Sequence, residues 1–417
     1  MKITNEQSRV LHLNSLMLWE GPGKIKALDV IKKLSYLQID AIYSIARSQD
    51  IVLHNRTTSY QEKDVWKLLE EKKLFEGFAH ARCLLPIDDL PYYYTKMLRR
   101  RESVPQWYRS VSEELDWQTE ILETAKIKKE ISVKDITIPE NFPKFTGWNQ
   151  APKRMLDYLS TRGYLFSSKR EKFQSFYKLP ELQFKNFDTI VSNLPSREEE
   201  FLFHIKSTLR ATGPSPLHRL LHYKYIHSSI ELNGKKISPR TLVSKYIKDG
   251  TLTEIKVEGN NGKHVTYVCL PDQSDMITDL PQKDQDEYNC FFLSPFDNAL
   301  WSRESLFAQY NFDYKMEVYV PKIKRIYGFF TMPILFGPDF VGRVDVKLER
   351  KDGTFHFLKW SLEKNFKQMK SIGYFWKELT HAIERITLFH KVSKVDLGNL
   401  SSTYKNKIQK LADIKVS

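Results

Sequence analysis

The sequence contains little cysteine and no long apolar run. Only three cysteines occur in 417 residues, namely Cys83, Cys269 and Cys290. They lie far apart, are odd in number, and include neither a CxxC pair nor a histidine at metal-ligand spacing. These features argue against a disulfide framework and against a cysteine metal site. We therefore expect three reduced thiols in the protein core.

Apolar stretches are too short for a membrane helix. No segment approaches 18 uninterrupted apolar residues, which is the length that would span a bilayer. Residues 1–14 also lack the apolar run and the small-residue cleavage site of a signal peptide. The sequence therefore predicts a cytoplasmic protein without a membrane partner.

Acidic residues are fewer than basic ones. The chain has 65 Lys and Arg against 51 Asp and Glu, which gives a formal charge of +14, and 41% of its residues are hydrophobic. A chain of this size can bury two to four globular cores. The positive balance favours a polyanionic partner over an acidic small molecule. Nucleic acid and an anionic membrane surface both satisfy that condition.

The N-terminal segment has the pattern of two helices followed by extended chain. Residues 5–34 predict helix, turn and helix, with Asn5 as a possible cap and Gly21-Pro22-Gly23 as the break. Residues 36–42 are short and β-branched, and residues 50–54 alternate in polarity, which favours strands. Helices followed by a strand-rich wing are typical of winged-helix modules.

Two later segments repeat this order. One has a helix over Ala151–Thr161, a turn at residues 162–164 and a hairpin through residues 165–168 and 175–179. The other is predicted to have helices near residues 197–211, 215–223 and 238–248, then strands over Thr253–Glu258 and His264–Cys269 around the turn at residues 259–262.

The predicted fold is α+β and mainly helical. It has three tandem winged-helix (helix-turn-helix) modules, then a small antiparallel β-sheet or barrel with strands at residues 314–319, 327–332, 340–348 and 354–360, and a closing helix near residues 366–388. The expected domains are the first module at residues 1–89, a helical connector at 90–135, the second module at 136–192, the third at 193–275 and the barrel-like domain at 276–417.

Gln38 and Asp40 form the most suggestive polar pair. In extended chain, positions i and i+2 share a face, so Leu37, Ile39 and Ala41 would turn toward the core. A carboxylate and an amide would then point together at one target. On the residue pattern alone, a half-exposed strand or a helix cap is the stronger interpretation.

Several blocks keep one order over nearly the whole chain, and together they resemble the AlkZ/YcaQ family of DNA glycosylases. The blocks are Leu37-Gln38-Ile39-Asp40-Ala41-Ile42 with Arg47 and residues 51–56, residues 75–81, Gly147-Trp148-Asn149 with Lys153-Arg154, residues 177–181, Leu293-Ser294-Pro295-Phe296-Asp297-Asn298, Tyr319-Val320-Pro321 with Lys324-Arg325 and Tyr327-Gly328, and residues 341–347. Asp40 at the third motif position resembles the YcaQ branch, because the AlkZ branch has Gln there.

The resemblance implies a monofunctional glycosylase that removes N7-alkylated purines, including guanines joined in a nitrogen-mustard-type interstrand crosslink. Asp40 would act as anion and base, and Gln38 would hold the attacking water or a sugar oxygen. No lysine nucleophile, cofactor or metal is implied. The chain departs from the family at Ser48-Gln49-Asp50, where we expect Ala-His-His, so no role of those histidines carries over.

The implied partner is double-stranded DNA that contains alkylated purines or crosslinks, bound by a monomer in the cytoplasm at the nucleoid. A crosslinked base cannot swing freely into a closed pocket, so we expect an open cleft with basic surroundings. The candidate DNA contacts are Arg47, Arg56, His80, Arg82, Lys153, Arg154, Lys169, Arg170, Lys172, Lys324, Arg325 and Arg343.

Some of these candidates have a second interpretation. The segment Lys169-Arg170-Glu171-Lys172 is favoured as a wing tip. His80 fits either a contact to DNA or a packed core histidine, and Arg343 fits a structural pair with Asp345. Residues 293–297 are interpreted as a scaffold turn.

Two other function classes compete with the glycosylase. A non-enzymatic winged-helix transcription regulator would also carry basic tandem modules, but replacing Asp40 would leave its DNA binding and output nearly intact. A nuclease or other metal enzyme would need clustered Asp, Glu and His ligands, and the sequence has none at metal-ligand spacing.

Overall fold

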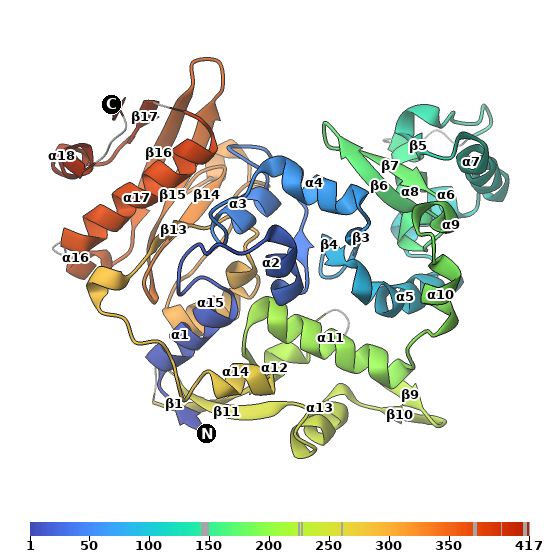
Figure 1. Ribbon diagram of the computed structural model, residues 1–417, viewed down its shortest axis with the longest axis horizontal. Coiled ribbons are helices and arrows are strands. Elements are labelled where there is room, and N and C mark those ends of the chain that lie inside the picture. The colour runs from blue at the N-terminus through green and yellow to red at the C-terminus, as the bar shows by residue number, and fades with distance from the viewer. Residues whose placement is uncertain are drawn as a thin grey trace.

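The computed structural model describes residues 1–142, 150–223, 226, 228–259, 262–369, 373–392, 394–411 and 415–416. It confirms an α+β protein, in which helices surround several small sheets and one larger sheet (Figure 1). Within these residues, no helix combines the length and apolar character needed to cross a bilayer. The predicted block at residues 147–149 lies outside the described residues.

The first unit combines short helices with a three-stranded sheet. Its helices are α1 (Asn5–Ser15), α2 (Ala27–Leu34), α3 (Ser48–His54) and α4 (Glu62–Glu70), and its strands, in sheet order, are β2 (Leu37–Gln38), β4 (Arg82–Pro86) and β3 (Leu74–Phe78). Thr4, rather than the predicted Asn5, caps α1, because its hydroxyl accepts the Gln7 N–H while the Gln7 side chain accepts the Thr4 N–H.

The strand predicted at residues 50–54 is wrong, because these residues belong to α3. Ile51 packs into the core of the C-terminal sheet, whereas Val52 and Leu53 pack into the core of the first unit. A helix wedged between two cores is apolar on several sides, so a run of three apolar residues between Asp50 and His54 does not distinguish it from a strand.

The middle of the chain holds the predicted connector region and the second helix-and-hairpin unit. Its helices are α5 (Leu90–Glu102), α6 (Arg109–Ser112), α7 (Leu115–Lys128), α8 (Ala151–Thr161), α9 (Pro180–Gln183) and α10 (Phe187–Ser192), and its strands, in sheet order, are β5 (Ile131–Ser132), β7 (Gln174–Lys178) and β6 (Phe166–Glu171). The predicted helix and hairpin are confirmed. The hairpin turns at Lys172 and Phe173, both at positive φ, and its tip reaches toward α4 (Figure 1).

The third unit also has helices followed by a hairpin. Its helices are α11 (Arg197–Thr212), α12 (Leu217–Leu220), α13 (Pro239–Lys248) and α14 (Pro271–Asp275), and its strands are β8 (Ser215–Pro216), β9 (Ile230–Leu232), β10 (Lys235–Ile237), β11 (Thr253–Glu258) and β12 (His264–Cys269). The helix predicted at residues 215–223 is shortened to α12, since residues 215–216 pair with β12 instead. Asn260 and Asn261 of the predicted turn lie outside the described residues.

The N-terminal strand joins the sheet of the third unit. Strand β1 (Lys2–Ile3) runs parallel to β11, with Lys2 opposite Lys256 and Ile3 opposite Val257. The two short strands β9 and β10 form a separate hairpin. The start of the chain is therefore tied to a unit about 250 residues later.

The C-terminal region forms a six-stranded sheet. In order its strands are β13 (Cys290–Phe292), β14 (Thr331–Phe336), β15 (Asp339–Glu349), β16 (Thr354–Leu362), β17 (Lys394–Asp396) and β18 (Lys415–Val416), and its helices are α15 (Arg303–Tyr310), α16 (Phe366–Met369), α17 (Gly373–Phe389) and α18 (Ser402–Leu411). Strands β16, β17 and β18 pair in parallel, so the sheet is mixed rather than antiparallel throughout as predicted.

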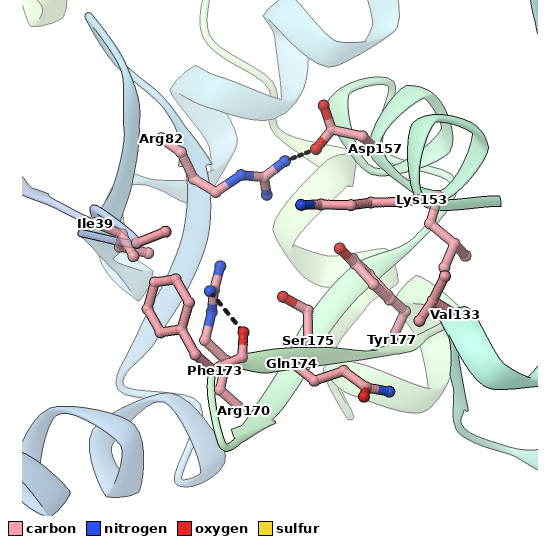
Figure 2. Close-up of a pocket in the computed structure, with 12 residues that line it drawn as sticks. Ile39, Arg82, Val133, Lys153, Asp157, Arg170, Phe173, Gln174, Ser175 and Tyr177 are labelled. Carbon is pink, nitrogen blue, oxygen red and sulfur yellow. Dashed lines mark hydrogen bonds and ion pairs between the residues drawn. The ribbon is translucent and has the colours of Figure 1, made fainter. Parts of the chain in front are cut away.

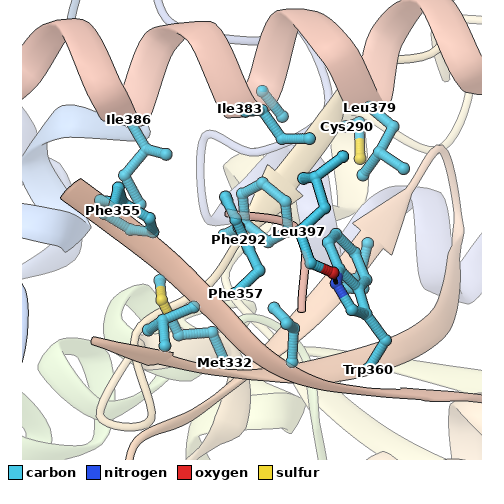
Figure 3. Packing of buried hydrophobic residues seen from close by; sticks show 14 of the residues in the cluster. Cys290, Phe292, Met332, Phe355, Phe357, Trp360, Leu379, Ile383, Ile386 and Leu397 are labelled. Carbon is cyan, nitrogen blue, oxygen red and sulfur yellow. Dashed lines mark hydrogen bonds between the residues drawn. The ribbon is translucent and has the colours of Figure 1, made fainter. Parts of the chain in front are cut away.

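Helix α17 covers this sheet through an apolar face. Leu379, Ile383 and Ile386 point at Phe355 and Phe292 on the strands (Figure 3). The spacing of three and four residues places one stripe of α17 against the sheet, as the predicted closing helix requires.

The strand predicted at residues 314–319 does not form, and the one predicted at 327–332 begins only at Thr331. The buried Glu317 carboxylate explains this difference. It accepts the backbone N–H groups of Ile326, Tyr327 and Gly328 at 3.0, 2.7 and 3.1 Å. These bonds hold residues 317–328 in a compact loop and occupy N–H groups that a strand at residues 326–328 would need for a ladder.

Candidate active site

The segment that carries Gln38 and Asp40 leaves the first sheet at its edge. Strand β2 pairs with β4, and the Ile39 N–H still donates to the Arg82 carbonyl at 2.9 Å. Leu37 and Ile39 are buried as predicted. Ala41 is exposed instead of buried, because the ladder has ended before it and no core lies beneath.

Gln38 is half-buried and hydrogen-bonded to a second predicted residue. Its Oε1 lies 2.8 Å from Nε2 of His80, and the His80 ring packs against Trp301 with centroids 3.9 Å apart. When Nε2 carries the proton, His80 donates to Oε1 and orients the Gln38 amide. His80 is thus a neighbour of the candidate glutamine as well as a packed ring.

Asp40 is a half-buried carboxylate with one fixed oxygen. Its Oδ1 accepts the Ile42 N–H at 2.8 Å. Partial burial raises the pKa of Asp40 above its ordinary value, and the bond from Ile42 acts in the opposite direction. A carboxylate with a raised pKa is a better proton acceptor.

A series of buried polar side chains connects the Asp40 backbone to Tyr60. Gln49 Oε1 lies 3.5 Å from the Asp40 backbone nitrogen, and Gln49 Nε2 lies 3.5 Å from Asp50 Oδ2. Asp50 Oδ1 accepts the Tyr60 hydroxyl at 2.6 Å. Burial raises the pKa of Asp50 to about 7, although Tyr60 and Arg47 act to lower it.

Sequence reasoning assigned no role to Gln49 or Asp50. Both side chains are almost completely buried, at 0% and 1% exposed. The only signal was their position, since two polar residues directly precede the apolar run 51–53. Their partners come from the fold, so the sequence pattern alone could not identify them.

A cleft of about 370 Å³ opens beside the candidate residues. Ile39 and Ala41, which flank Asp40, form one wall, and the opposite wall comes from α8 and the β6–β7 hairpin (Figure 2). Three predicted contacts, Arg82, Lys153 and Arg170, line it together. The structure thus gathers basic side chains from two units next to Asp40.

Two predicted contacts, Arg56 and Arg343, are corrected, because they are 1% and 2% exposed. The Arg56 guanidinium forms two 2.9 Å bonds to Asp297, which agrees with a scaffold role for residues 293–297. Arg343 pairs with Glu363 at 2.6 Å rather than with the predicted Asp345. Neither guanidinium can reach a phosphate.

The Arg170 side chain is also mostly buried and hydrogen-bonded within the protein. Its Nε and Nη2 donate to the two oxygens of the buried Glu76 at 2.6 and 2.7 Å. With its side chain only 7% exposed, Arg170 fastens the hairpin to β3 more than it offers a free charge. This corrects its predicted role as a wing-tip contact.

The other predicted contacts are at least partly accessible. Lys153, Lys172 and Lys324 are exposed. Lys169 pairs with Glu130 and Glu171, Arg154 donates to Ser110, and Arg325 donates to the Val320 carbonyl. Arg47 packs over Phe173 at 4.1 Å, and Arg82 bridges Glu76 and Asp157. A role of these side chains in binding DNA stays a prediction.

The three cysteines are free and buried, as predicted. Within the described part of the chain, no cluster of three or more His, Cys, Asp or Glu side chains has an arrangement that could hold a metal ion.

Comparison with known proteins places the chain in a family. A family model described as DNA glycosylase AlkZ-like matches residues 31–389, which include the Gln38–Asp40 segment and the cleft. The fold is similar to that of Streptomyces sahachiroi DNA glycosylase AlkZ, with a TM-score of 0.59, 17% sequence identity, and coverage of 95% of this chain and 99% of that one. The chain belongs to the AlkZ-like family and is a DNA glycosylase, an enzyme of DNA repair.

Proposed function

We propose that this glycosylase hydrolyses the N-glycosidic bond of N7-alkylated purines, including unhooking of N7-guanine interstrand crosslinks. Asp40 is the base and anion, and Gln38 positions the water or a sugar oxygen. One observation carries the proposal. A half-buried carboxylate stands between two residues that line a basic cleft, two positions from a glutamine oriented by His80.

The proposed chemistry needs little acid catalysis. An N7-alkylguanine already carries a positive charge, and when its bond to C1′ breaks, the bonding electrons return to the ring and the base leaves neutral. The sugar becomes oxocarbenium-like and is stabilised by the Asp40 anion. Water then adds to C1′ and passes a proton to Asp40. Gln38, hydrogen-bonded to His80, can hold that water in line.

The cleft supports an open rather than an enclosed site. It lies between two units of the fold and is lined by cationic side chains, which suits a duplex whose lesion remains tied to the opposite strand. We propose that a monomer binds the damaged duplex through Arg47, His80, Arg82, Lys153, Arg154, Lys169, Lys172, Lys324 and Arg325, in the cytoplasm at the nucleoid.

We further propose that the three helix-and-hairpin units are winged-helix modules. The proposed modules are residues 1–89, 136–192 and 193–275, with a connector at 90–135 and the sheet domain at 276–417. The recurrence of helices followed by a hairpin in α8 with β6–β7 and in α13 with β11–β12 supports this division.

The test is base release from a duplex with one N7-methylguanine. Wild-type protein is expected to release free N7-methylguanine and leave an abasic site, and Asp40→Asn is expected to bind the duplex but release base at least 100-fold more slowly. A duplex without protein measures spontaneous loss. Release by Asp40→Asn at the parental rate would remove Asp40 from the chemistry.

A further inference from the structure

We propose that the cleft beside Asp40 binds one backbone phosphate of the damaged strand, through Lys153 Nζ and the hydroxyls of Ser175 and Tyr177. This inference rests on the proposed function and names the part of the substrate that the cleft holds. It also gives Lys153 a specific role that the other basic residues around the site do not share.

Two acids accompany the arginines of the cleft, namely Asp157 in its lining and Glu76 paired to Arg82 and Arg170, and both are already satisfied by protein partners. Glu76 accepts from Arg170 and Ser167 and lies 3.5 Å from Arg82. Asp157 accepts from Arg82 through one oxygen and from the Tyr108 hydroxyl at 2.7 Å through the other. These carboxylates therefore leave little negative charge to face the cleft.

Lys153 adds a positive charge that these pairs do not balance. It is exposed on α8, and among the residues that the structure describes no acid lies within 4.0 Å of its ammonium. Arg82, Arg170 and Lys153 together carry three positive charges against two on Glu76 and Asp157. The local field thus favours an anion.

Donor groups converge on one space. Lys153, Ser175 and Tyr177 point their polar ends into the gap that faces Ile39 (Figure 2). An ammonium and two hydroxyls can all donate to phosphate oxygens, which carry lone pairs and a negative charge. In the substrate of a DNA glycosylase, backbone phosphates are the groups with this chemistry.

A nucleobase fits the same space less well. An extruded base is usually held between aromatic or apolar faces. The Phe173 ring in this cleft already carries the Arg47 guanidinium at 4.1 Å and that of Arg170 at 4.5 Å. Because Ile39 and Ala41 line the same cleft, a phosphate bound there lies beside the segment that carries Asp40.

The experiment is a binding cycle on a duplex in which each phosphate near one N7-methylguanine is replaced, one at a time, by a neutral methylphosphonate. Wild-type protein is expected to lose about tenfold in affinity at one position. The Lys153→Met variant should lose the same factor in affinity for unmodified DNA. A methylphosphonate at the sensitive position should then cause no further loss of affinity in this variant. The slope of log K against log salt should also become less negative by about one in this variant.

Two variants control for general effects. Tyr177→Phe removes one donor without a charge and should show a smaller loss at the same position. Lys185→Met removes an exposed lysine outside the cleft and should leave the position-specific loss unchanged. If the affinity losses caused by Lys153→Met and by the methylphosphonate multiply at every position, Lys153 and the tested phosphates act independently. That result would overturn the inference. Base release by wild-type protein, measured in the same samples, tests the proposed function separately.

Discussion

At the scale of single residues, the contact between His80 and Gln38 is the most informative. His80 was open to two interpretations from sequence, as a DNA contact or as a packed core histidine. The 2.8 Å contact to Gln38 Oε1 adds a third, in which the imidazole orients the amide that we propose positions the water. The ring is also packed between Tyr36 and Trp301, which limits its rotation.

A double-mutant cycle tests this positioning role. His80→Ala should slow base release about fivefold, since one hydrogen bond of about 1 kcal/mol is lost, and it should affect kcat more than KM. In a Gln38→Ala background the same substitution should have almost no further effect. Equal losses in both backgrounds, measured under single-turnover conditions, would show that His80 acts independently of Gln38.

The buried Asp50 predicts an unusual dependence of stability on pH. Its pKa is about 7 in the folded protein, above the ordinary value of 3.8. Between these two values the folded state binds more protons than the unfolded state, so the free energy of unfolding falls as pH rises. The loss amounts to roughly 3 to 4 kcal/mol from pH 4 to pH 7.

Urea unfolding of wild-type protein and Asp50→Asn from pH 4 to pH 8 measures this effect. The neutral amide cannot ionise, so the variant should gain stability relative to wild-type protein as pH rises. Comparing the two curves cancels the contribution of Asp89, whose pKa burial also raises to about 7. A constant difference across the range would mean that Asp50 does not titrate there.

At the scale of elements, one buried ion pair fastens the end of α3 to the turn that follows β13. Arg56 lies two residues beyond the end of α3 and donates to both oxygens of Asp297, to the Leu16 carbonyl and to the Val52 carbonyl. Both side chains of the pair are fully shielded from solvent. Removing one partner would strand the other charge inside the protein.

Arg56→Met should therefore lower the free energy of unfolding by about 3 to 5 kcal/mol. The matched control is Lys67→Met, which removes an exposed ion pair to Glu71 on α4 and should cost less than about 0.5 kcal/mol. Chemical denaturation of both variants gives the comparison. A loss from Arg56→Met no greater than that of the control would contradict a structural role for the pair.

Elements with strong local signals could be predicted from the sequence, and those set by distant contacts could not. Helices α8, α11 and α13 carry apolar periodicity together with a cap or an early proline, and the β11–β12 hairpin has a clear turn pattern. Helix α3 lacks such a signal because its burial comes from two other parts of the chain. The parallel pairing of β1 with β11 involves two residues and has no local pattern at all.

The site shows the same division. Gln38 and Asp40 were identified because a family resemblance singled them out, and the cleft beside them fits that assignment. Arg56 and Arg343 were misassigned, because an arginine is usually exposed and nothing in the local sequence indicated burial. Gln49 and Asp50 were missed, since their role depends on a backbone nitrogen nine residues away and on Tyr60.

At the scale of the whole molecule, the formal charge of +14 predicts salt-sensitive binding to undamaged DNA. Each phosphate neutralised by a cation releases bound counterions, so log K should fall linearly with log salt, at about 0.9 per phosphate. Fluorescence anisotropy from 50 to 200 mM salt measures the slope, and several contacts should give a value steeper than −3. A flat line would mean that the positive charge is dispersed and incidental.

The anchoring of the β6–β7 hairpin to β3 by Arg170 and Glu76 has a mechanical consequence. This buried ion pair joins the two walls of the cleft, so the distance between the walls is fixed in the folded protein. The walls cannot move apart unless the ion pair between Arg170 and Glu76 breaks. Under the proposed function, the duplex would therefore have to change its shape to place a bulky adduct at this cleft.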